Sequence, residues 1–541
     1  MTRKQKRLAL TLVTGLMVLT LLAAGCGTQP SPSSETGATP ATEVAELRLP
    51  GGDWGLPTPF TFYPRGPGYV HLSLIYDTLI WKDDKGVIPW LAEKWEPDAR
   101  ATTWTFTLRP GLKWQDGRPL TARDVAFTFR YLKEHPVEWF NLGMIQSVEA
   151  RDERTVVFTL KQPHMPFLQQ VAGNVPVIPE HVWAQVADPR QEARPELVMG
   201  SGPYKLVSYD QSQGAYAYEA NPDFFLGPPR VKKLLFVPAG DQVAALQRGD
   251  VHAADIPATL AEQFRQDPRF EVLSGPAFWV LKLQFNPDKA PFNDVRVRRA
   301  LAYAIDREEL VRRAVPGGTA GAKPGSPGFL PPDSSWHDPE VAGLYPPDPD
   351  KARSLLKEVG LFDRNGDGLA EDAAGKPARF TLLTQQNYTR EAEVIKLMLR
   401  EVGLECEVKA LETKTLDGLI GAGQYELALT GHGGLGGDPA IISGFGVFRG
   451  GALSPGTPRE AAYEELAQKL LTEPQTERRR EICREMQRLY AQSLPCLPLY
   501  YPVWYFAYDP KVFSGWFFTA EGGIAVGIPM FYNKVAFVGR H

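Results

Sequence analysis

The chain has 541 residues, with 59 lysines and arginines against 63 aspartates and glutamates, for a formal net charge of −4. This slightly acidic balance argues against a protein that binds nucleic acid through a basic surface. The length exceeds what one hydrophobic core organises, so we expect two or three domains. The 50 glycines and 48 prolines favour a mixed fold rich in strands and loops over a helical bundle.

The N-terminus carries the pattern of an export signal. Four basic residues among the first seven precede an apolar run over residues 8–24, and a polar stretch follows. A short apolar run with a charged flank is typical of a cleaved signal rather than of a spanning helix. The run ends in Ala-Ala-Gly-Cys26, which resembles a bacterial lipobox, in which the cysteine is lipidated and becomes the new N-terminus. An ordinary cleaved signal with a chance cysteine is the alternative.

Cleavage of residues 1–25 would remove four positive charges and change the net charge from −4 to −8. Residues 26–45 are rich in Pro, Ser and Thr, and we predict a flexible, lipid-anchored linker. No later apolar run approaches the roughly twenty residues that a spanning helix needs. We therefore expect an extracytoplasmic protein that a lipid holds at the cell membrane, in the periplasm or on the outer face of the cytoplasmic membrane.

Residues 89–132 predict a strand and a helix in close succession. Residues 103–109 alternate, with Trp104, Phe106 and Leu108 on one face, as in a half-buried strand. Two turns that contain glycine follow. Thr121 is then a predicted N-cap, and Asp124 adds negative charge to the first turn of the helix.

Later segments alternate between predicted helices and strands. Asp294 is a predicted N-cap, and Asp348-Pro349 predicts the start of a further helix that Gly360 ends. Three arginines of the helix after Asp294 are expected on a solvated face: Arg296, Arg298 and Arg299. This alternation favours a second α/β domain in the later part of the chain.

Three blocks of sequence carry a resemblance to a known family. The first is PWLAEKWEPDARATTWTFTLRPGLKWQDGRPLTARDVAF at residues 89–127. The second runs from GSGPYKLVSYD to ANPDFFLGPPRVKKLLF at residues 200–236, and the third is FNPDKAPFNDVRVRRALAYAIDREEL at 285–310. Their order resembles the extracytoplasmic solute-binding proteins of family 5, the peptide/nickel class, which serve ABC importers. The resemblance implies an α/β, two-lobed fold of the periplasmic-binding-protein type II (Venus flytrap) class, with an extra subdomain in lobe one. Such a protein closes over its ligand at a hinge.

The resemblance also implies the domain boundaries. It places lobe one at residues 46–82, 199–282 and 504–541, its extra subdomain at 83–198, and lobe two at 283–503. The implied partners are the membrane permease subunits of an ABC transporter and their ATPases, and we expect a monomer.

The predicted function is capture of a peptide or peptide-like solute, without catalysis. The chain has no motif of a serine hydrolase, a zinc protease or a phosphate-binding loop. Two kinds of alternative stay open. In the first, the transported ligand is not a peptide but a nickel or other metal chelate, or an oligosaccharide. In the second, the protein is a sensor lipoprotein that takes no part in transport.

Ligand identity depends most on residues 431–439, GHGGLGGDP. In peptide-binding members the matching segment carries an aspartate that pairs with the peptide amine, and that position here is Leu435. A buried ammonium without a carboxylate costs on the order of several kcal/mol, so a free amine would need Asp438 or a shifted loop. His432 stands where those members have tryptophan, and it is a candidate nickel ligand or a stacking residue.

Further cleft candidates follow from the same resemblance. Thr58 and Phe60 belong to the loop that corresponds to the pocket segment of lobe one, together with Tyr63 and Arg65. Arg65 would bind a carboxylate in a bidentate manner. In addition, Phe278-Trp279 at the first crossing between lobes would form an apolar or stacking wall. The alternative for each of these residues is a purely structural role, either in a surface loop or in the core.

Residues 363–368 begin like a calcium loop. Asp363, Asn365 and Asp367 stand at oxygen-ligand positions, and Glu371 stands at the ninth position. The twelfth position, where an EF-hand needs a bidentate glutamate, is Ala374. Because hairpins of this type are common in the family that the chain resembles, we interpret the segment as a tight polar turn and expect no resident cofactor.

Three cysteines follow Cys26: Cys406, Cys483 and Cys496. Cys483 and Cys496 are nearest in sequence and form the first candidate pair. We favour three buried thiols, because a core of this size needs no covalent support.

Overall fold

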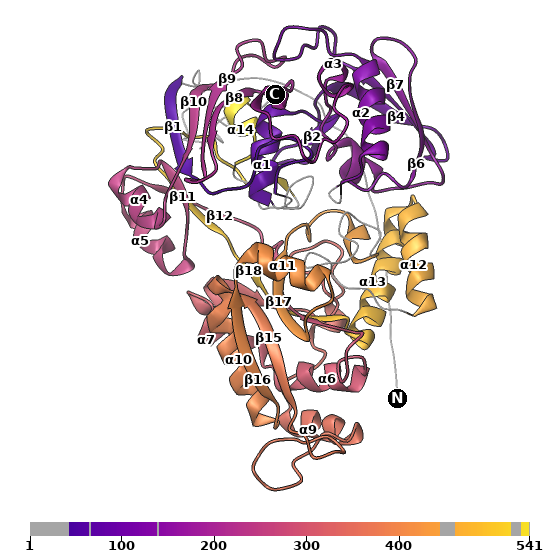
Figure 1. Cartoon of the computed structure of the whole chain (residues 1–541), viewed down its shortest axis with the longest axis vertical. Coiled ribbons are helices and arrows are strands. Elements are labelled where there is room, and N and C mark those ends of the chain that lie inside the picture. Colours follow the sequence, from indigo (N-terminus) through magenta and orange to yellow (C-terminus); the bar gives the residue numbers. More distant parts are fainter. Residues whose placement is uncertain (1–42, 64–65, 138–139, 444–459, 521–531, 540–541) are drawn as a thin grey trace, which may run out of the picture. The chain divides into compact units, whose positions relative to one another are not determined.

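The structure is a computed structural model that describes residues 43–63, 66–137, 140–443, 460–520 and 532–539 (Figure 1). Two predicted site residues, Cys26 and Arg65, lie outside the described residues. Across the described ranges, every helix is too short or too polar to cross a membrane.

The first part of the chain is built on a four-stranded sheet in the order β1-β10-β9-β8. Its strands are β1 (Val44–Pro50), β8 (Tyr204–Asp210), β9 (Ala215–Ala220) and β10 (Val231–Val237). β1 pairs with β10 in parallel, with Leu47 opposite Leu234, while the other pairs are antiparallel. The buried helix α1 (Gly66–Ile75) packs against β8. This sheet therefore joins the start of the described chain to residues almost two hundred positions later.

A second antiparallel sheet has the order β4-β5-β7-β6. Its strands are β4 (Ala92–Pro97), β5 (Thr103–Leu108), β6 (Ile145–Ala150) and β7 (Thr155–Leu160), and the short pair β2 (Ile80–Lys82) and β3 (Val87–Pro89) precedes them. The predicted alternation in β5 is confirmed, because Trp104, Phe106 and Leu108 are buried. The helix α2 (Ala122–Glu134) begins at Thr121 as predicted, with a reciprocal capping box between Thr121 and Asp124.

The later part of the chain forms a six-stranded sheet in the order β14-β18-β13-β17-β15-β16. Its strands are β13 (Val280–Phe285), β14 (Ala322–Pro324), β15 (Arg379–Gln385), β16 (Glu405–Leu411), β17 (Leu427–His432) and β18 (Cys496–Pro502). The central strands β13 and β17 are buried along their whole length. Figure 1 shows α10 running along β15 and β16. The helices of this part are α6 (Val295–Ala304), α7 (Arg307–Ala314), α8 (Pro339–Ala342), α9 (Pro349–Glu358), α10 (Thr389–Glu401), α11 (Thr413–Gly421), α12 (Ala461–Thr472) and α13 (Thr476–Ser493).

A three-stranded sheet in the order β11-β19-β12 stands where the two parts connect. Its strands are β11 (Ala253–Ile256), β12 (Glu271–Ser274) and β19 (Tyr505–Tyr508). The chain passes from β12 into β13, and it returns from β18 into β19. We name the elements β1 to β12 together with β19 lobe one, and β13 to β18 with their helices lobe two. The residue boundaries proposed from sequence stay a prediction.

The helix caps of lobe two agree with the sequence, but one arginine does not. Asp294 and Asp348 cap α6 and α9 as predicted, through side-chain hydrogen bonds from Arg296 N–H and Lys351 N–H. The prediction that Arg298 faces solvent is wrong, because its side chain is buried. Its guanidinium donates to the carbonyls of Ser493 at 2.7 Å and Leu494 at 2.9 Å. These carbonyls end α13, where a helix leaves acceptors without internal donors, so the arginine satisfies them.

The three cysteines that the structure describes are free, buried thiols. The preference for thiols over a disulfide is therefore confirmed for Cys406, Cys483 and Cys496. Burial raises the pKa of Cys483 to about 12 and that of Cys496 to about 11, so both are held as neutral thiols.

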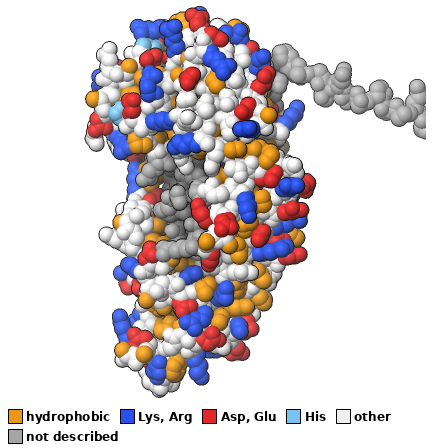
Figure 2. Space-filling model, turned by 90° about the vertical axis from the view of Figure 1, so that its right-hand side faces the viewer, with side chains coloured by type: hydrophobic (Ala, Val, Ile, Leu, Met, Phe, Trp, Pro, Cys, Tyr) orange, Lys and Arg blue, Asp and Glu red, His pale blue; other side chains and the backbone are white. Residues whose placement is uncertain are grey.

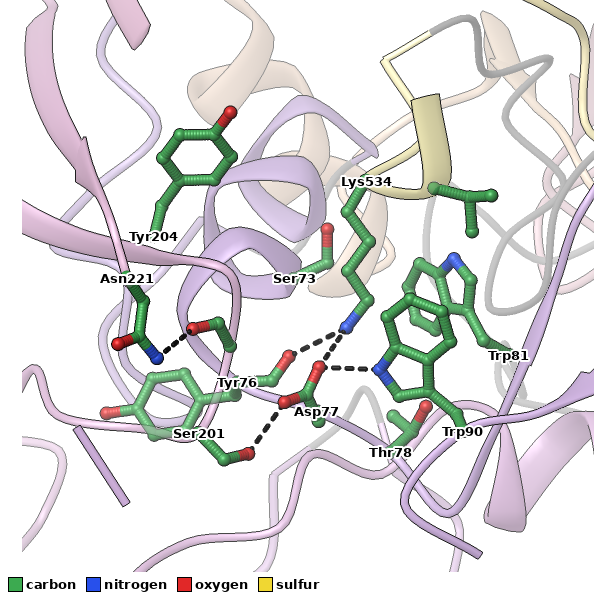
Figure 3. Close-up of polar contacts among 12 residues, drawn as sticks. Ser73, Tyr76, Asp77, Thr78, Trp81, Trp90, Ser201, Tyr204, Asn221 and Lys534 are labelled. Carbon is green, nitrogen blue, oxygen red and sulfur yellow. Dashed lines mark hydrogen bonds and ion pairs between the residues drawn. The ribbon is translucent and has the colours of Figure 1, made fainter. Parts of the chain in front are cut away.

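A buried ion pair holds a late segment of the chain in the core of lobe one (Figure 3). The Nζ of Lys534 lies 2.6 Å from Oδ1 of Asp77, and both side chains are completely buried. The carboxylate also accepts hydrogen bonds from Trp90 Nε1 at 2.6 Å and Ser201 Oγ at 2.7 Å. The ammonium lies 4.2 Å from the centre of the Trp81 ring. These contacts satisfy both charges, which makes their burial tolerable.

Candidate functional site

The first wall of the candidate site lies on lobe two, where β13 and β17 pair. Trp279 precedes β13, and its indole lies across Gly431 in β17, so a Cβ at Gly431 would be 1.8 Å from Cη2 of the ring. The indole also stacks on Tyr388, with ring centres 6.1 Å apart and planes at 30°. Only glycine leaves room for this ring. Trp279 and Tyr388 thus form a half-exposed aromatic surface.

His432, next along β17, is buried and pairs with Val280 across the sheet. Its ring stacks on Phe329 at a centroid distance of 5.6 Å, and Nδ1 lies 2.9 Å from the carbonyl oxygen of Gly433. In the described chain, the one group of three side chains arranged to hold a metal does not include His432. Nickel ligation by His432 stays a prediction.

Leu435 belongs to the hydrophobic core rather than to an open pocket. Its side chain is 1% exposed and lies in one cluster with Phe278 and Phe329. Its backbone N–H donates to the carbonyl of Phe278 at 3.3 Å, which ties the segment to the crossing strand. The predicted candidates Phe278, Trp279, His432 and Leu435 are therefore neighbours.

Asp438 does not offer a free carboxylate. It forms a bidentate ion pair with Arg479 of α13, with both N–O distances at 2.8 Å and both side chains largely buried. Its Oδ1 also accepts from the N–H of Ala440 at 2.9 Å. Because Arg479 already neutralises the charge, this carboxylate is poorly suited to bind a second cation.

On lobe one, Thr58 and Phe60 organise their own loop. Thr58 is fully buried, and its Oγ1 lies 2.6 Å from Oγ1 of Thr61. Phe60 packs on Trp183 at 5.0 Å and on Tyr131 at 5.7 Å, measured between ring centres. The polar and ring contacts that the structure describes for Thr58 and Phe60 stay within lobe one. Their role in ligand binding stays a prediction.

The end of the same loop reaches lobe two. The hydroxyl of Tyr63 donates to Oδ2 of Asp417 in α11 at 2.9 Å. Lys414, one turn earlier, lies 3.5 Å from Oδ2 of Asp53 and 5.0 Å from the centre of the Tyr63 ring. Partial burial raises the pKa of Asp53, but hydrogen bonds from Tyr209 and the Gly55 N–H together with the charge of Lys414 bring it below its ordinary value. Asp53 is therefore ionised and paired with Lys414 at neutral pH.

A second contact between the lobes forms on another part of lobe one. Gln169, in the short helical turn η1 (Leu168–Ala172), accepts the N–H of Asp438 through Oε1 at 3.3 Å. Nearby, the N–H of Met165 donates to the carbonyl of Leu471 at the end of α12, at 2.8 Å. The two lobes are thus hydrogen-bonded at two separate places in this conformation.

Sequence reasoning missed the residues that make these contacts. Tyr388, Asp417, Lys414 and Gln169 carry no motif, and each acts only through a partner far away in the chain. The glycine-rich character of residues 431–437 was one available signal, because close packing of a ring on a strand requires glycine.

The fold and this site define a class of protein: two lobes joined by two crossings, with aromatic and hydrogen-bonding residues where the lobes meet. That class is a two-lobed solute-binding protein. The family model for bacterial extracellular solute-binding proteins, family 5, matches residues 86–445 of the chain. The chain belongs to this family, and the resemblance seen in its sequence is confirmed.

Individual relatives and solved structures agree with this family assignment. The oligopeptide-binding protein AppA of Bacillus subtilis is 30% identical over 431 residues, which are 76% of this chain and 78% of AppA. The structure of AppA with a nonapeptide covers 87% of this chain and 95% of its own, with a TM-score of 0.75 and 23% identity. NikZ of Campylobacter jejuni, solved with Ni(L-His), covers 88% of this chain and 97% of its own, with a TM-score of 0.74 and 22% identity. The two-lobed α/β fold is confirmed by these structures.

A Brucella ovis protein named for peptide binding by an ABC transporter is 31% identical over 368 residues. The match spans 65% of this chain and 66% of that relative.

Proposed function

We propose that this protein captures a peptide or peptide-like solute between its two lobes and delivers it to the permease of an ABC importer, without catalysing a reaction. The observation that carries the proposal is the pair of hydrogen-bonded contacts between the lobes, together with the aromatic surface of Trp279 and Tyr388 on lobe two. A ligand that contacts both lobes stabilises the closed arrangement by its differential affinity for it. The names of AppA and the Brucella relative support a peptide as the ligand.

The site chemistry narrows the kind of peptide. Segment 431–439 presents Leu435 in the core and Asp438 already paired with Arg479, so it supplies no free carboxylate for a terminal amine. Burying an ammonium beside such a segment would be unfavourable. We therefore propose recognition through stacking and main-chain groups, with little dependence on a free amino terminus.

The remaining parts of the proposal concern location and partners. We propose that Cys26 carries a lipid that holds the protein at the outer side of the cell membrane, and that it works as a monomer with permease and ATPase subunits. On the face in Figure 2, basic and acidic side chains are interspersed, which supports a partner other than nucleic acid. Mass spectrometry of the N-terminal peptide, compared with a Cys26→Ala variant, tests the lipid: a diacylglyceryl mass lost in the variant is expected.

The ligand is tested first by native and then denaturing mass spectrometry of the purified protein, to identify molecules that copurify. A series of peptide masses is expected. A nickel complex or a sugar would instead support the second candidate, for which NikZ with Ni(L-His) is the precedent.

A calorimetric titration then tests whether binding depends on the free amino terminus of the peptide. A peptide found in the first experiment is compared with its N-acetylated form, and affinities within about threefold of one another are expected. A loss of about a hundredfold or more on acetylation, on the order of 3 kcal/mol, would show that a carboxylate outside segment 431–439 binds the amine. The proposal of amine-independent recognition would then be withdrawn.

A further inference from the structure

The hairpin between α9 and β15 in lobe two contains a group of acidic side chains that the proposed function does not use. Glu371 forms bridges with Phe362 on one side and with Pro377 on the other, so it sits at the centre of the hairpin. The N–H of Ala370 donates to the carbonyl of Gly403 at 2.8 Å, which ties the hairpin to the end of α10. The segment is thus a fixed part of lobe two.

Three carboxylates converge here. One oxygen from each of Asp363, Asp367 and Glu371 lies within 4.8 Å of the other two. Gly366 and Gly368 both have positive φ, at 85° and 84°, which lets the loop turn tightly around the group. The N–H groups of these glycines donate to the Asp363 carboxylate at 2.7 and 2.9 Å. Hydrogen bonds of this kind explain the turn, but they do not explain why a third acid points into it.

Glu371 is the decisive residue. Its side chain is 3% exposed, while Asp363 and Asp367 are open to solvent. Oε2 accepts the N–H of Arg364 at 2.7 Å. Oε1 is buried and has no hydrogen-bond partner among the residues that the structure describes. A buried carboxylate that has one oxygen without a donor and is grouped with two other carboxylates is unfavourable unless a cation joins the group.

Arg364, the cation that follows Asp363 in the sequence, directs its guanidinium elsewhere. The guanidinium of Arg364 lies 3.8 Å from the centre of the Phe362 ring, and its donors reach the carbonyls of Asp372 and Gly360, both at 3.1 Å. Within the described chain, the ion pairs under 4.0 Å do not include Asp363, Asp367 or Glu371. The three negative charges therefore lack a protein counter-charge.

We propose that Asp363, Asp367 and Glu371 bind one calcium ion. Calcium prefers oxygen ligands and tolerates irregular geometry, whereas magnesium demands a near-ideal octahedron. The sequence interpretation as a plain turn rested on Ala374 at the twelfth position and on the frequency of such hairpins in the family. The structure instead brings Glu371, at the ninth position, inward to supply the third carboxylate. Because all three ligands lie between α9 and β15, the ion would cross-link the hairpin internally.

The test uses the purified full chain after dialysis against a chelator. Titration with calcium chloride in a calorimeter is expected to show one site per chain, and 1 mM calcium is expected to raise the thermal unfolding midpoint, because a ligand of the folded state stabilises it. Magnesium chloride at the same concentration is expected to do neither. Absence of calcium heat together with an unchanged midpoint would overturn the proposal.

Two variants test whether calcium binds at these three carboxylates. Glu371→Gln is expected to weaken calcium binding by more than about tenfold and to abolish the midpoint rise, while unfolding no earlier than wild type in chelator, since it removes an unpaired buried charge. Asp372→Asn is the matched control, because it removes one charge from the same hairpin outside the group, and it is expected to keep the calcium response. Equal calcium binding by wild type and Glu371→Gln would overturn the assignment. Since the peptide site shares none of these residues, peptide affinity measures the proposed function separately.

Discussion

At the residue scale, burial shifts the pKa of His71, a histidine inside lobe one, far from its ordinary value. It lies in α1, is 3% exposed, stacks on Tyr216 at 3.9 Å and hydrogen-bonds with the hydroxyl of Tyr218 at 2.8 Å. Burial lowers its pKa from the ordinary 6.5 to about 3. The folded protein therefore holds this ring neutral, while the unfolded chain takes up a proton below pH 6.5.

This difference predicts acid sensitivity. The contribution of His71 is fully present above pH 6.5 and is lost as the pH falls toward 3, at about 1.4 kcal/mol per pH unit, or about 3 kcal/mol by pH 4. Chemical denaturation of wild type and His71→Asn across this range measures it, and the variant is expected to lose less stability. His135→Asn, which replaces a histidine at the partly exposed C-cap of α2, is the control for the substitution itself. Parallel curves for wild type and His71→Asn would contradict the assignment to His71.

A second prediction at this scale concerns the effect of a side chain at Gly431 on ligand binding and stability. Alanine at this position would place its Cβ 1.8 Å from the Trp279 ring and 2.6 Å from the carbonyl oxygen of Val280, so the indole must move. We expect Gly431→Ala to weaken ligand binding by about tenfold or more and to lower stability by about 1–3 kcal/mol. Gly343→Ala, whose Cβ would meet nothing within 4 Å, is the control. Unchanged ligand affinity in a folded Gly431→Ala protein would remove Trp279 from the site.

At the element scale, local signals predicted structure well. The alternation of β5, the capping box of α2 and the aspartate caps of α6 and α9 were all predicted correctly, because each depends on residues within a few positions. The burial of Arg298 was not predictable in this way. Its acceptors, Ser493 and Leu494, lie almost two hundred positions later and carry no side-chain signal.

Because Arg298 joins α6 to the end of α13, we expect its replacement to lower the stability of the protein. Arg298→Met would leave the carbonyls of Phe292, Ser493 and Leu494 buried without this donor, at a cost of about 3 kcal/mol or more. Arg296→Met is the matched control on the same helix. It removes only an exposed ion pair with Asp294, which solvent screens, so a much smaller loss of stability is expected. Denaturant unfolding of both variants measures the difference, and equal losses would contradict the structural role of Arg298.

At the scale of the whole molecule, the sequence carried the family and the two-lobed fold, but not the contacts between lobes. Residues 278–279 and 431–435 were each proposed as cleft residues from the resemblance, and the structure places them next to one another. Asp417 and Gln169 were missed, since their roles exist only once distant segments have come together. The same holds for the pairing of Asp438 with Arg479, which changes what that carboxylate can bind.

The contact between Tyr63 and Asp417 predicts an effect on closure. Tyr63→Phe removes one hydrogen bond to a carboxylate that joins the lobes, worth about 1.5 kcal/mol, and so shifts the population toward open forms by about tenfold. Small-angle X-ray scattering of the ligand-free protein is expected to show a larger radius of gyration. Tyr303→Phe, within α6, is the control and is expected to match wild type. An unchanged radius for Tyr63→Phe would mean that this bond does not hold the lobes together in solution.

The ion pair of Lys534 with Asp77 has a consequence for how the chain acquires its structure. Its partners are 457 positions apart, and lobe two is inserted between them. When residues cross a membrane in sequence order, the core of lobe one stays incomplete until this lysine arrives. Contacts of such long separation form slowly, because the intervening chain must first be ordered. In a chain that crosses the membrane unfolded, Asp77 and its tryptophans would be exposed until then, and we expect such an intermediate to depend on folding helpers that shield apolar surface until the last segment docks.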